Sequence, residues 1–267
     1  MKDKLRRLKK ILKSYKGLVL AYSGGVDSTF LLAIAARVLK DRLIAVTATS
    51  RLYPGSEVES ARKMARRFQV RHRVIKTEEL RDRRFVTNPP DRCYYCKREL
   101  FNKLKKIARR YGYEVADGTN YSDRRDFRPG KRAARELGIK SPLSEAGLTK
   151  EEIRILSKRL GLKTWDKPAM ACLASRIPYG IKITRQIIEQ IARAESFLKK
   201  MGVGTVRVRH HGLIARIETR PEDFYRIIKH HSKIVRRFRK IGFLYVTLEL
   251  AGYQSGSMNR VLRKTKL

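Results

Sequence analysis

Short apolar runs alternate with stretches of helical periodicity over the first 116 residues of the chain. Residues 18–22 and 43–48 are apolar runs that predict buried strands, and the apolar positions of residues 29–39 repeat at helical spacing between them. These segments predict a βαβ unit with a parallel pair of strands, since parallel neighbours need a crossover connection. The same patterns predict helices at residues 57–68 and 97–111 and extended segments at residues 71–75 and 113–116.

The alternation of strands and helices predicts an α/β fold with a doubly wound, mostly parallel sheet. Ligands of such sheets bind at the carboxyl ends of the strands. Three segments follow predicted strands there, namely residues 23–28, residues 48–51 and the run Asp117-Gly118-Thr119-Asn120. We therefore expect these segments to converge on a ligand, with Ala48 and Gly118 among the contacts.

The pattern changes near residue 180. Before that point, Thr149-Lys150-Glu151-Glu152 has the spacing of a capping box and predicts a helix that runs to about residue 160. After it, the sequence predicts a helix at residues 184–201, alternating strands at 205–209 and 213–218 with a turn at His210-His211-Gly212, a helical stretch at 221–239 and a strand at 243–250. We predict two domains: residues 1–180, and a smaller α+β domain of residues 181–267 that binds substrate or supports a homo-oligomer.

Length and hydropathy favour a soluble, cytosolic protein. The chain has 267 residues, enough for a large core, and a hydrophobic fraction of 42%. No apolar run reaches the roughly 18 residues that a membrane helix needs. Residues 1–16 are basic and amphipathic, without the apolar segment and small-residue cleavage site of a signal peptide.

The charge balance changes the expected range of partners. Lys and Arg number 64 against 25 Asp and Glu, which gives a net charge of +39. Nucleic acid, a nucleotide substrate or an acidic partner would each match this charge. A thermophile's charged surface explains it equally well, and the presence of only four Asn and four Gln supports a hot-growing source. Charge alone therefore does not make this a nucleic-acid-binding protein.

Ser23-Gly24-Gly25-Val26-Asp27-Ser28 has the composition and position of a phosphate-binding loop. Its glycines let the backbone turn tightly and approach an anion, while amide groups and the following helix N-terminus point at that anion. Ser23 and Ser28 add hydroxyl groups, and Asp27 can hold Mg²⁺ or orient the loop. The loop lacks the lysine of the P-loop motif G-x-x-x-x-G-K-[ST]. An ordinary βα turn is the alternative, which the strand–turn–helix context disfavours.

The chain has three cysteines, Cys93, Cys96 and Cys172. An odd number in a cytosolic-looking protein favours metal binding or catalysis over a disulfide framework. Cys93 and Cys96 form a CxxC motif placed just before the predicted helix, beside Lys97 and Arg98, where positive charge favours thiolates. Three thiolates can hold a [4Fe-4S] cluster and leave one iron open to a ligand such as sulfide. A zinc or redox CxxC and an inert, buried Cys172 remain alternatives.

The phosphate loop resembles that of the N-type ATP-pyrophosphatases, whose adenine nucleotide alpha hydrolase-like domain splits ATP between its α- and β-phosphates. Over nearly its whole length the chain is similar to the LarE family, the ATP-dependent sulfur transferases of nickel-pincer cofactor synthesis. The resemblance rests on the following segments: residues 23–28, 45–48, 117–120, 128–130, 141–143, 145–150 and 172–180.

The LarE resemblance implies a substrate, a reaction and a set of site residues. The substrate is a pyridinium-3,5-dicarboxylate mononucleotide, whose carboxylate is adenylated and then converted by sulfur to a thiocarboxylate. Some members sacrifice the sulfur of the cysteine matching Cys172, whereas others bind a cluster through cysteines matching all three found here. The resemblance also implies a phosphate site at Arg207, Arg209 and Glu218, with Glu195 nearby; a solvated strand face is the alternative.

Three other functions fit part of the sequence. A tRNA 2-thiolation enzyme would share the loop and the cluster chemistry and would explain the charge, but the chain has no additional CxxC pairs for zinc fingers. An amide-forming synthetase would need an ammonia source and leaves the cysteines unexplained. A non-enzymatic nucleic-acid-binding protein would leave the phosphate loop idle. We therefore expect an enzyme that uses ATP, Mg²⁺ and a [4Fe-4S] cluster. Sulfide or another sulfur donor would supply its sulfur.

Overall fold

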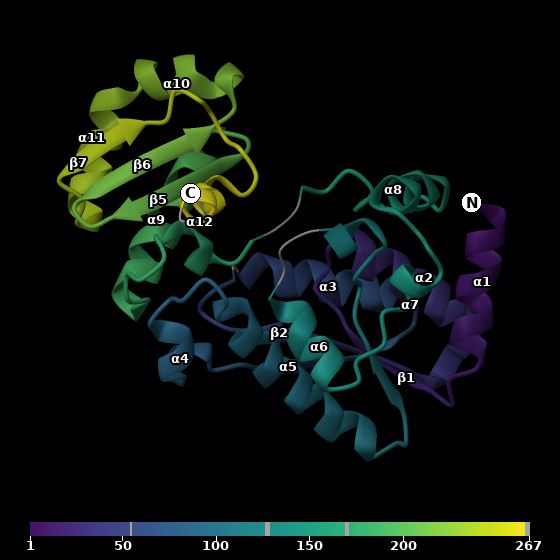
Figure 1. The fold of residues 1–267 in the computed structure, drawn as a ribbon. Coiled ribbons are helices and arrows are strands. Elements are labelled where there is room, and N and C mark those ends of the chain that lie inside the picture. Colours follow the sequence, from purple (N-terminus) through teal and green to yellow (C-terminus); the bar gives the residue numbers. More distant parts are fainter. Residues whose placement is uncertain (54, 126–128, 169–170, 265–267) are drawn as a thin grey trace. The chain divides into compact units, whose positions relative to one another are not determined.

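A computed structural model describes residues 1–53, 55–125, 129–168 and 171–264 (Figure 1). The chain divides into two compact units. The first contains Met1–Asp82 and Asp91–Met170, and the second contains Arg83–Pro90 and Ala171–Leu267. The domain boundary predicted at residue 180 stays a prediction. The second compact unit begins its main segment at Ala171 and also includes residues 83–90.

The first unit is built on a four-stranded sheet in the order β3-β2-β1-β4. Its strands are β1 (Leu18–Ala21), β2 (Leu43–Thr49), β3 (Arg71–Lys76) and β4 (Glu114–Ala116). Every neighbouring pair is parallel, with Leu18 of β1 opposite Leu43 of β2 and Glu114 of β4. The predicted α/β fold with its parallel sheet is thereby confirmed.

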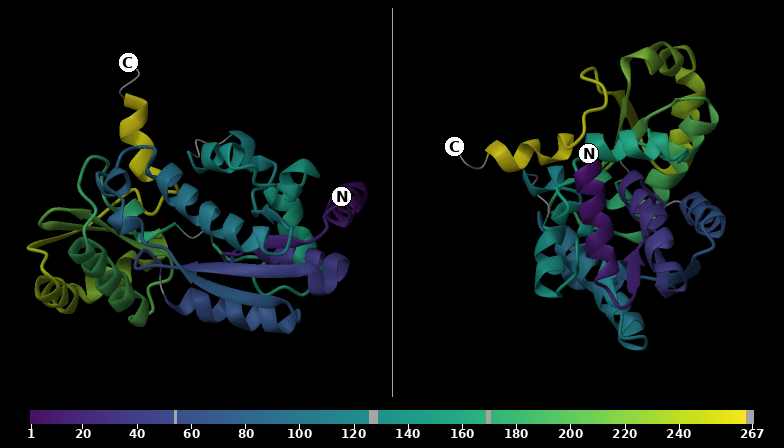
Figure 2. Two further views of the ribbon diagram at one scale, coloured as in Figure 1. Left: turned by 90° about the horizontal axis from the view of Figure 1, so that it is seen from below. Right: turned by 90° about the vertical axis from the view of Figure 1, so that its right-hand side faces the viewer.

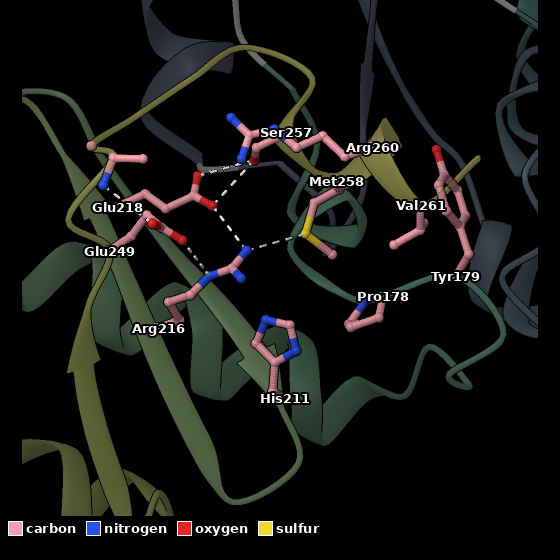
Figure 3. Close-up of a pocket in the computed structure, with 12 residues that line it drawn as sticks. Pro178, Tyr179, His211, Arg216, Glu218, Glu249, Ser257, Met258, Arg260 and Val261 are labelled. Carbon is pink, nitrogen blue, oxygen red and sulfur yellow. Dashed lines mark hydrogen bonds and ion pairs between the residues drawn. The ribbon is translucent and has the colours of Figure 1, made fainter. Parts of the chain in front are cut away.

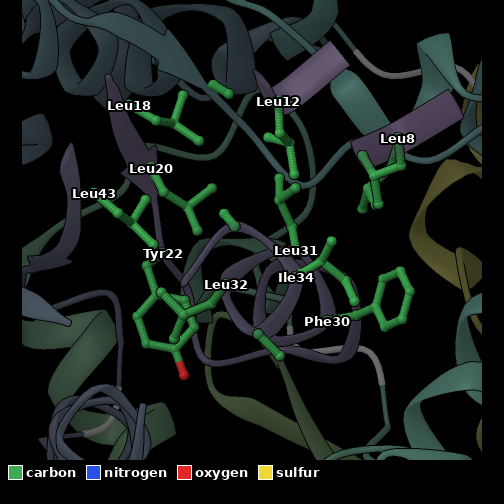
Figure 4. Packing of buried hydrophobic residues seen from close by; sticks show 14 of the residues in the cluster. Leu8, Leu12, Leu18, Leu20, Tyr22, Phe30, Leu31, Leu32, Ile34 and Leu43 are labelled. Carbon is green, nitrogen blue, oxygen red and sulfur yellow. The ribbon is translucent and has the colours of Figure 1, made fainter. Parts of the chain in front are cut away.

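Helices cover both faces of this sheet, as the left view of Figure 2 shows. Alternate residues of β1 belong to different clusters, because successive side chains of a strand point to opposite faces. Leu18 and Leu20 pack in the cluster drawn in Figure 4, and Val19 packs in a second cluster on the other face. The first face is covered mainly by α1 (Lys2–Lys13), α2 (Val26–Leu39), α3 (Gly55–Arg67) and α8 (Lys150–Arg159), and the second by α5 (Arg92–Arg109) and α6 (Gly130–Glu136).

The start of α5 corrects one prediction. The sequence placed Cys93 and Cys96 before a helix that would start at residue 97, but α5 begins at Arg92 and contains both. Its buried apolar side chains start with Tyr94 and continue with Phe101, one stripe of helical spacing that carries the helix over the cysteines. The two cysteines therefore lie near the N-terminus of α5, three residues apart and on one side of the helix.

The capping box predicted for α8 is confirmed. The Thr149 hydroxyl accepts a hydrogen bond from the amide of Glu152 at 3.3 Å, and the Glu152 carboxylate accepts from the amide of Thr149 at 2.9 Å. The ammonium of Lys4 also lies 2.8 Å from Glu152. These contacts fix the N-terminus of α8 in space.

The second unit contains a three-stranded sheet in the order β5-β6-β7, with β5 (Val206–His211), β6 (Ile214–Thr219) and β7 (Tyr245–Leu248). β5 and β6 form an antiparallel hairpin, and β7 runs parallel to β6. Helices α9 (Arg185–Lys200), α10 (Phe224–Lys229) and α11 (His231–Ile241) contribute to the apolar cluster on one face. The predicted helical stretch at residues 221–239 is thus divided in two at His230.

The opposite face of this sheet is polar. Val206 and Val208 of β5 belong to the apolar cluster, so the alternating residues Arg207 and Arg209 lie on the other face. Arg207 is opposite Glu218 of β6, and Arg209 is opposite Arg216 of the same strand. Arg207 and Arg209 therefore lie on one face of the sheet, together with the Glu218 carboxylate of the neighbouring strand.

The remaining elements are short. They are the α-helices α4 (Arg83–Val86), α7 (Pro142–Glu145) and α12 (Arg260–Lys264), and the 3₁₀ helices η1 (Lys40–Arg42), η2 (Glu79–Arg81), η3 (Ser122–Arg125), η4 (Leu173–Arg176), η5 (Pro221–Asp223) and η6 (Ser257–Asn259). Within the described ranges, no helix has the length and apolar character needed to cross a membrane.

Candidate functional site

The predicted phosphate loop connects β1 to α2. Gly24 has φ +69°, a left-handed conformation that favours glycine, and Gly25 is the N-cap of α2. The Ser23 and Ser28 hydroxyl groups lie 3.0 Å apart across the loop. Asp27 and Ser28 fall in the first turn of α2, whose free amide groups and dipole attract an anion. The loop therefore has the local geometry of an anion site.

Gly118 brings the end of β4 against this loop. A Cβ added to Gly118 would lie 3.0 Å from the amide nitrogen of Ser28 and 3.1 Å from its Cα, so only glycine fits without displacing the backbone. Ser141 and Thr119 donate hydrogen bonds to the Asp117 carboxylate at 2.9 Å and 2.7 Å, which hold this turn in place. The segment after β4 thus converges on the phosphate loop, as expected. Ala48 lies in β2, half-buried and opposite Ile75.

Asp27 is held by two residues far from it in the sequence. The Asn120 amide donates to Oδ1 at 3.3 Å, and the Lys150 ammonium lies 2.6 Å from Oδ2. Lys150 is the first residue of α8, and its backbone amide donates to the Ser122 hydroxyl at 3.1 Å. A cation of the protein itself therefore contacts the carboxylate that was predicted to hold Mg²⁺ or to orient the loop.

A second lysine, Lys167, supports the loop from another side. Its ammonium donates to the Gly24 carbonyl at 3.1 Å and to the Glu57 carboxylate at 2.7 Å. Because Gly24 is buried, its carbonyl needs a hydrogen-bond partner, and Lys167 provides one. Neither Lys150 nor Lys167 was predicted as a loop contact. For Lys150, the capping box predicted its position at the start of a helix but not this contact.

Cys93 and Cys96 lie in the first unit with different surroundings. Cys93 is exposed, whereas Cys96 is half-buried and its thiol donates to Glu79 Oε1 at 3.7 Å. Glu79 is 3% exposed, and its Oε1 also accepts from the Thr77 hydroxyl at 2.8 Å. None of the three cysteines forms a disulfide, so each thiol can serve as a ligand or nucleophile.

Cys172 lies in the second unit, where Arg176 fixes its backbone. Nη1 of Arg176 donates to the carbonyls of Ala171 and Cys172 at 2.8 and 3.0 Å. The same guanidinium forms a two-point ion pair with Glu195, at 2.8 and 3.1 Å, and both side chains are buried. Glu195 also accepts from the amide of Val208 at 3.1 Å, which ties the Cys172 segment to β5.

Arg207 and Arg209 are buried on the polar face of the second sheet. Arg209 contacts Glu218 at 2.5 Å and donates to the Ser257 hydroxyl and the Ser175 carbonyl at 3.0 Å each. Arg207 instead donates to the Val206 carbonyl and lies over the ring of Tyr253. Burial lowers the pKa of Arg207, and the nearby charge of Arg176 lowers it further.

These arginines leave one positive charge without a carboxylate partner. Arg176 pairs with Glu195 and Arg209 pairs with Glu218, but in the described parts of the chain no carboxylate lies within ion-pair distance of Arg207. The Glu195 carboxylate, which pairs with Arg176, offsets only part of the Arg207 charge, so the polar face is suited to an anionic ligand. In the sequence, the spacing of two between Arg207 and Arg209 indicated that both lie on one face of a strand.

A cavity of about 200 Å³ adjoins Glu218 in the second unit (Figure 3). Arg216 lies between Glu218 and Glu249, at 3.2 and 3.6 Å, and His211 lies beside Arg216 in the lining of the cavity. Burial and Arg216 lower the pKa of His211, which favours its neutral form. Ligand pockets typically have about 300–1,000 Å³, so this cavity suits a phosphate group better than a whole mononucleotide.

No group of three or more His, Cys, Asp or Glu side chains forms a compact metal site within the described ranges. Cys93 and Cys96 belong to the first unit and Cys172 to the second. The three-cysteine cluster therefore stays a prediction. The same holds for the roles assigned to the phosphate loop, to Ala48 and Gly118, and to Arg207, Arg209 and Glu218.

Comparison with known proteins gives relatives along nearly the full chain. A protein of Lactiplantibacillus plantarum, pyridinium-3,5-bisthiocarboxylic acid mononucleotide synthase, is 38% identical over 96% of this chain and 94% of its own length. The chain belongs to the LarE family. An uncharacterised protein of Synechocystis is 43% identical over 99% of this chain and all of its own length, and one of Methanocaldococcus jannaschii is 33% identical over 94% and 98%. Residues 11–86 match the asparagine synthase family model.

LarE membership and the phosphate loop define the class of enzyme. The segment that matches the asparagine synthase model contains β1, the loop and α2, the part of the fold that binds ATP in PP-loop enzymes. The chain is accordingly an ATP-dependent sulfurtransferase of the LarE family, with a PP-loop α/β unit.

Proposed function

We propose that this enzyme adenylates a carboxylate of pyridinium-3,5-dicarboxylate mononucleotide and converts it to a thiocarboxylate. The observation that carries the proposal is the relationship, over nearly the whole chain, to the L. plantarum mononucleotide synthase. A carboxylate oxygen attacks the α-phosphorus of ATP, and pyrophosphate leaves. Sulfur then attacks the acyl carbon, and AMP leaves.

The phosphate loop supports the first step. The Ser23 and Ser28 hydroxyls, the left-handed turn at Gly24 and the N-terminus of α2 present donors to an anion. Asp27 would hold Mg²⁺, and its oxygen donors are of the kind that this ion prefers. In the structure this carboxylate forms an ion pair of 2.6 Å with the Lys150 ammonium, which Mg²⁺ would replace.

Three cysteine thiolates would hold the sulfur-delivering cluster. The donor set fits, because three free thiols suffice for three irons of a [4Fe-4S] cluster, and Cys93 and Cys96 lie one helical turn apart. When bound, the cluster would supply sulfide for the second step. The chain's own contribution at Cys172 is positional: Arg176 holds the carbonyls of residues 171 and 172, and Glu195 holds Arg176.

The polar face of the second sheet would bind the phosphate of the mononucleotide. Arg207 supplies the positive charge that lacks a carboxylate, and Arg209 is oriented beside it by Glu218. An arginine fork matches a phosphate group through two parallel donors. Because Glu195 links this face to the Cys172 segment, substrate phosphate and sulfur donor would be held within one connected set of contacts.

A tRNA 2-thiolation enzyme is the second candidate, favoured by the net charge of +39. The two functions differ in how binding depends on salt, because each neutralised RNA phosphate contributes a log–log slope of roughly −0.7 to −0.9. A mononucleotide offers one phosphate monoester, whereas an RNA surface engages several backbone phosphates. The family relationship favours the mononucleotide.

Arg207→Met should raise the KM for the mononucleotide by about ten-fold or more, because a charge-assisted hydrogen bond to phosphate contributes roughly 1.5–3 kcal/mol. Added tRNA should leave turnover unchanged. Arg209→Met is the less clean variant, since it also removes the partner of buried Glu218. Exposed Arg236→Met in α11 is the matched control and should leave KM unchanged. A salt slope of several units with tRNA, together with thiouridine in the product, would contradict the proposal.

The predicted homo-oligomer, cytosolic location and thermophilic source stay predictions, as does the identity of the upstream sulfur donor. The sulfur source also has two forms within the family resemblance, either cluster sulfide or sacrifice of Cys172.

A further inference from the structure

Tyr22 is the last residue before the phosphate loop, and its peptide group joins the sheet to the loop. It directly follows β1, is 2% exposed, and packs its ring in the apolar cluster of Figure 4. Its amide donates to the carbonyl of Val46 in β2 at 2.9 Å. Its carbonyl accepts a hydrogen bond from a side chain, the hydroxyl of Thr47, also at 2.9 Å. The sheet therefore holds both polar groups of this residue.

The direction of the Tyr22 carbonyl determines the direction of the Ser23 amide. A trans peptide group is planar, so the C=O of one residue and the N–H of the next point in opposite directions. The contact with Thr47 holds the Tyr22 carbonyl toward β2, and the Ser23 N–H therefore points away from that strand. Within the described ranges, this amide forms no hydrogen bond to a backbone carbonyl. It is thus one of the donors that the loop can offer to an anion.

His72 orients the Thr47 hydroxyl. Its Nε2 lies 2.8 Å from the hydroxyl oxygen. A threonine hydroxyl has one hydrogen, and the Tyr22 carbonyl can only accept, so the Thr47 hydrogen is directed to Tyr22. The Nε2 of His72 must then carry a proton and donate it to the Thr47 oxygen. Burial lowers the pKa of His72, and the charge of Arg62 lowers it further, which favours a neutral ring with its proton on Nε2.

The sheet fixes both of these side chains. Thr47 lies in β2 and is 5% exposed, and His72 lies in β3 and is half-buried. His72 is opposite Ala45, two residues from Thr47, so both side chains project from the same face. The His72 ring also packs edge-on against the Tyr22 ring, with 6.1 Å between centroids and 79° between planes. The imidazole is therefore held by packing as well as by its hydrogen bond.

We propose that His72 and Thr47 are positioning residues for the phosphate loop. The Nε2–H of His72 orients the Thr47 hydroxyl, and this hydroxyl orients the peptide group between Tyr22 and Ser23. The Ser23 amide is thereby directed at a phosphate of ATP before the nucleotide binds, which lowers the cost of ordering the loop on binding. Neither His72 nor Thr47 needs to touch the nucleotide. The inference rests on the proposed use of ATP at this loop.

The first test uses Thr47→Val, which keeps the shape of the side chain but removes the hydroxyl. Calorimetric titration of the full-length protein with pyrophosphate and Mg²⁺ should show an affinity about three- to ten-fold weaker, the size of one hydrogen bond. Thr47→Ser keeps the hydroxyl and should restore most of the affinity. The matched control is Thr219→Val in the second unit, where a fully buried hydroxyl donates to the Thr205 carbonyl at 2.9 Å. It should lower thermal stability to a similar degree but leave pyrophosphate affinity unchanged.

The second test uses His72→Phe, which keeps a ring against Tyr22 but removes the Nε2–H. Pyrophosphate affinity should fall by about two- to five-fold, because the Thr47 hydroxyl loses the donor that orients it. His72→Gln can present an N–H in place of Nε2 and should recover most of the loss. In the Thr47→Val background, His72→Phe should cause no further loss, since the contact with Tyr22 is already absent. His72 is only half-buried, so this variant tests the proposal even where Thr47→Val does not fold.

Unchanged pyrophosphate affinity in either single variant would overturn the inference, and so would losses that simply add in the double variant. An equal loss in Thr219→Val would also overturn it, because affinity would then follow overall stability and not the orientation of the loop. Failure of the unaltered protein to bind pyrophosphate would instead contradict phosphate binding at this loop, on which the proposed function depends. Thermal unfolding of each variant measures its stability.

Discussion

Asp27→Asn should reduce ATP-to-AMP turnover by at least about a hundred-fold, since loss of an electrostatic contact to the transition state has effects of this size. The substitution keeps the shape of the side chain but removes the charge that would hold Mg²⁺. It also breaks the contact with Lys150, a partly exposed ion pair whose contribution to folding is small after solvent screening. Pyrophosphate release assayed with the mononucleotide substrate measures the effect.

Gly25→Val tests the same loop through its backbone. Gly25 has φ −82°, which valine can adopt, and an added Cβ would meet only the Ser23 hydroxyl, at 3.4 Å. The fold should therefore be retained, while the branched side chain blocks the approach of phosphate to the amides. Gly24 is the poorer choice, because its φ of +69° would strain any side chain. Normal pyrophosphate release by both Asp27→Asn and Gly25→Val would contradict the loop assignment.

Each single Cys→Ala substitution at Cys93, Cys96 and Cys172 should remove most of the iron from anaerobically purified protein. The unaltered protein should be brown and contain about four irons per chain. The expected loss is large because a cluster held by three thiolates keeps only two ligands in each variant. Iron and acid-labile sulfide analysis, with visible absorbance, measures the result.

Tyr94→Phe is a matched control for the two cysteines of α5. It removes a hydrogen bond of 2.6 Å to Glu136 from the same helical turn but alters no thiol, so iron should be retained. Stoichiometric zinc in place of iron, with activity unchanged, would show that the CxxC motif is structural. A mass decrease of one H₂S at Cys172 after a single turnover would identify that cysteine as the sulfur source.

Much of the fold could be predicted from local patterns. The apolar runs that became β1 and β2 and the capping box of α8 carry their signal within a few residues, so their positions in the sequence predicted their structure. The start of α5 was misplaced because its first buried apolar residue, Tyr94, stands between two cysteines that showed no helical preference. Helix ends depend on caps and tertiary contacts more than on periodicity.

The contacts around the site could not be predicted from such local patterns. Lys150 meets Asp27 across 123 residues, and Lys167 meets Gly24 across 143. Arg176 and Glu195 are also joined only by folding. The sequence indicated that these residue types were present, but which lysine or carboxylate lies beside the loop is decided by how the helices pack on the sheet. The loop itself was predictable because its chemistry is contained in six consecutive residues.

The conversion of a carboxylate to a thiocarboxylate is the central claim, and mass spectrometry of the product tests it most directly. Anaerobic protein is incubated with pyridinium-3,5-dicarboxylate mononucleotide, ATP, Mg²⁺ and sulfide, with tRNA absent. The account predicts a mononucleotide product in which sulfur replaces one carboxylate oxygen, together with AMP and pyrophosphate in equal amounts. An unchanged mononucleotide under these conditions, with thiouridine formed when tRNA is supplied instead, would contradict it.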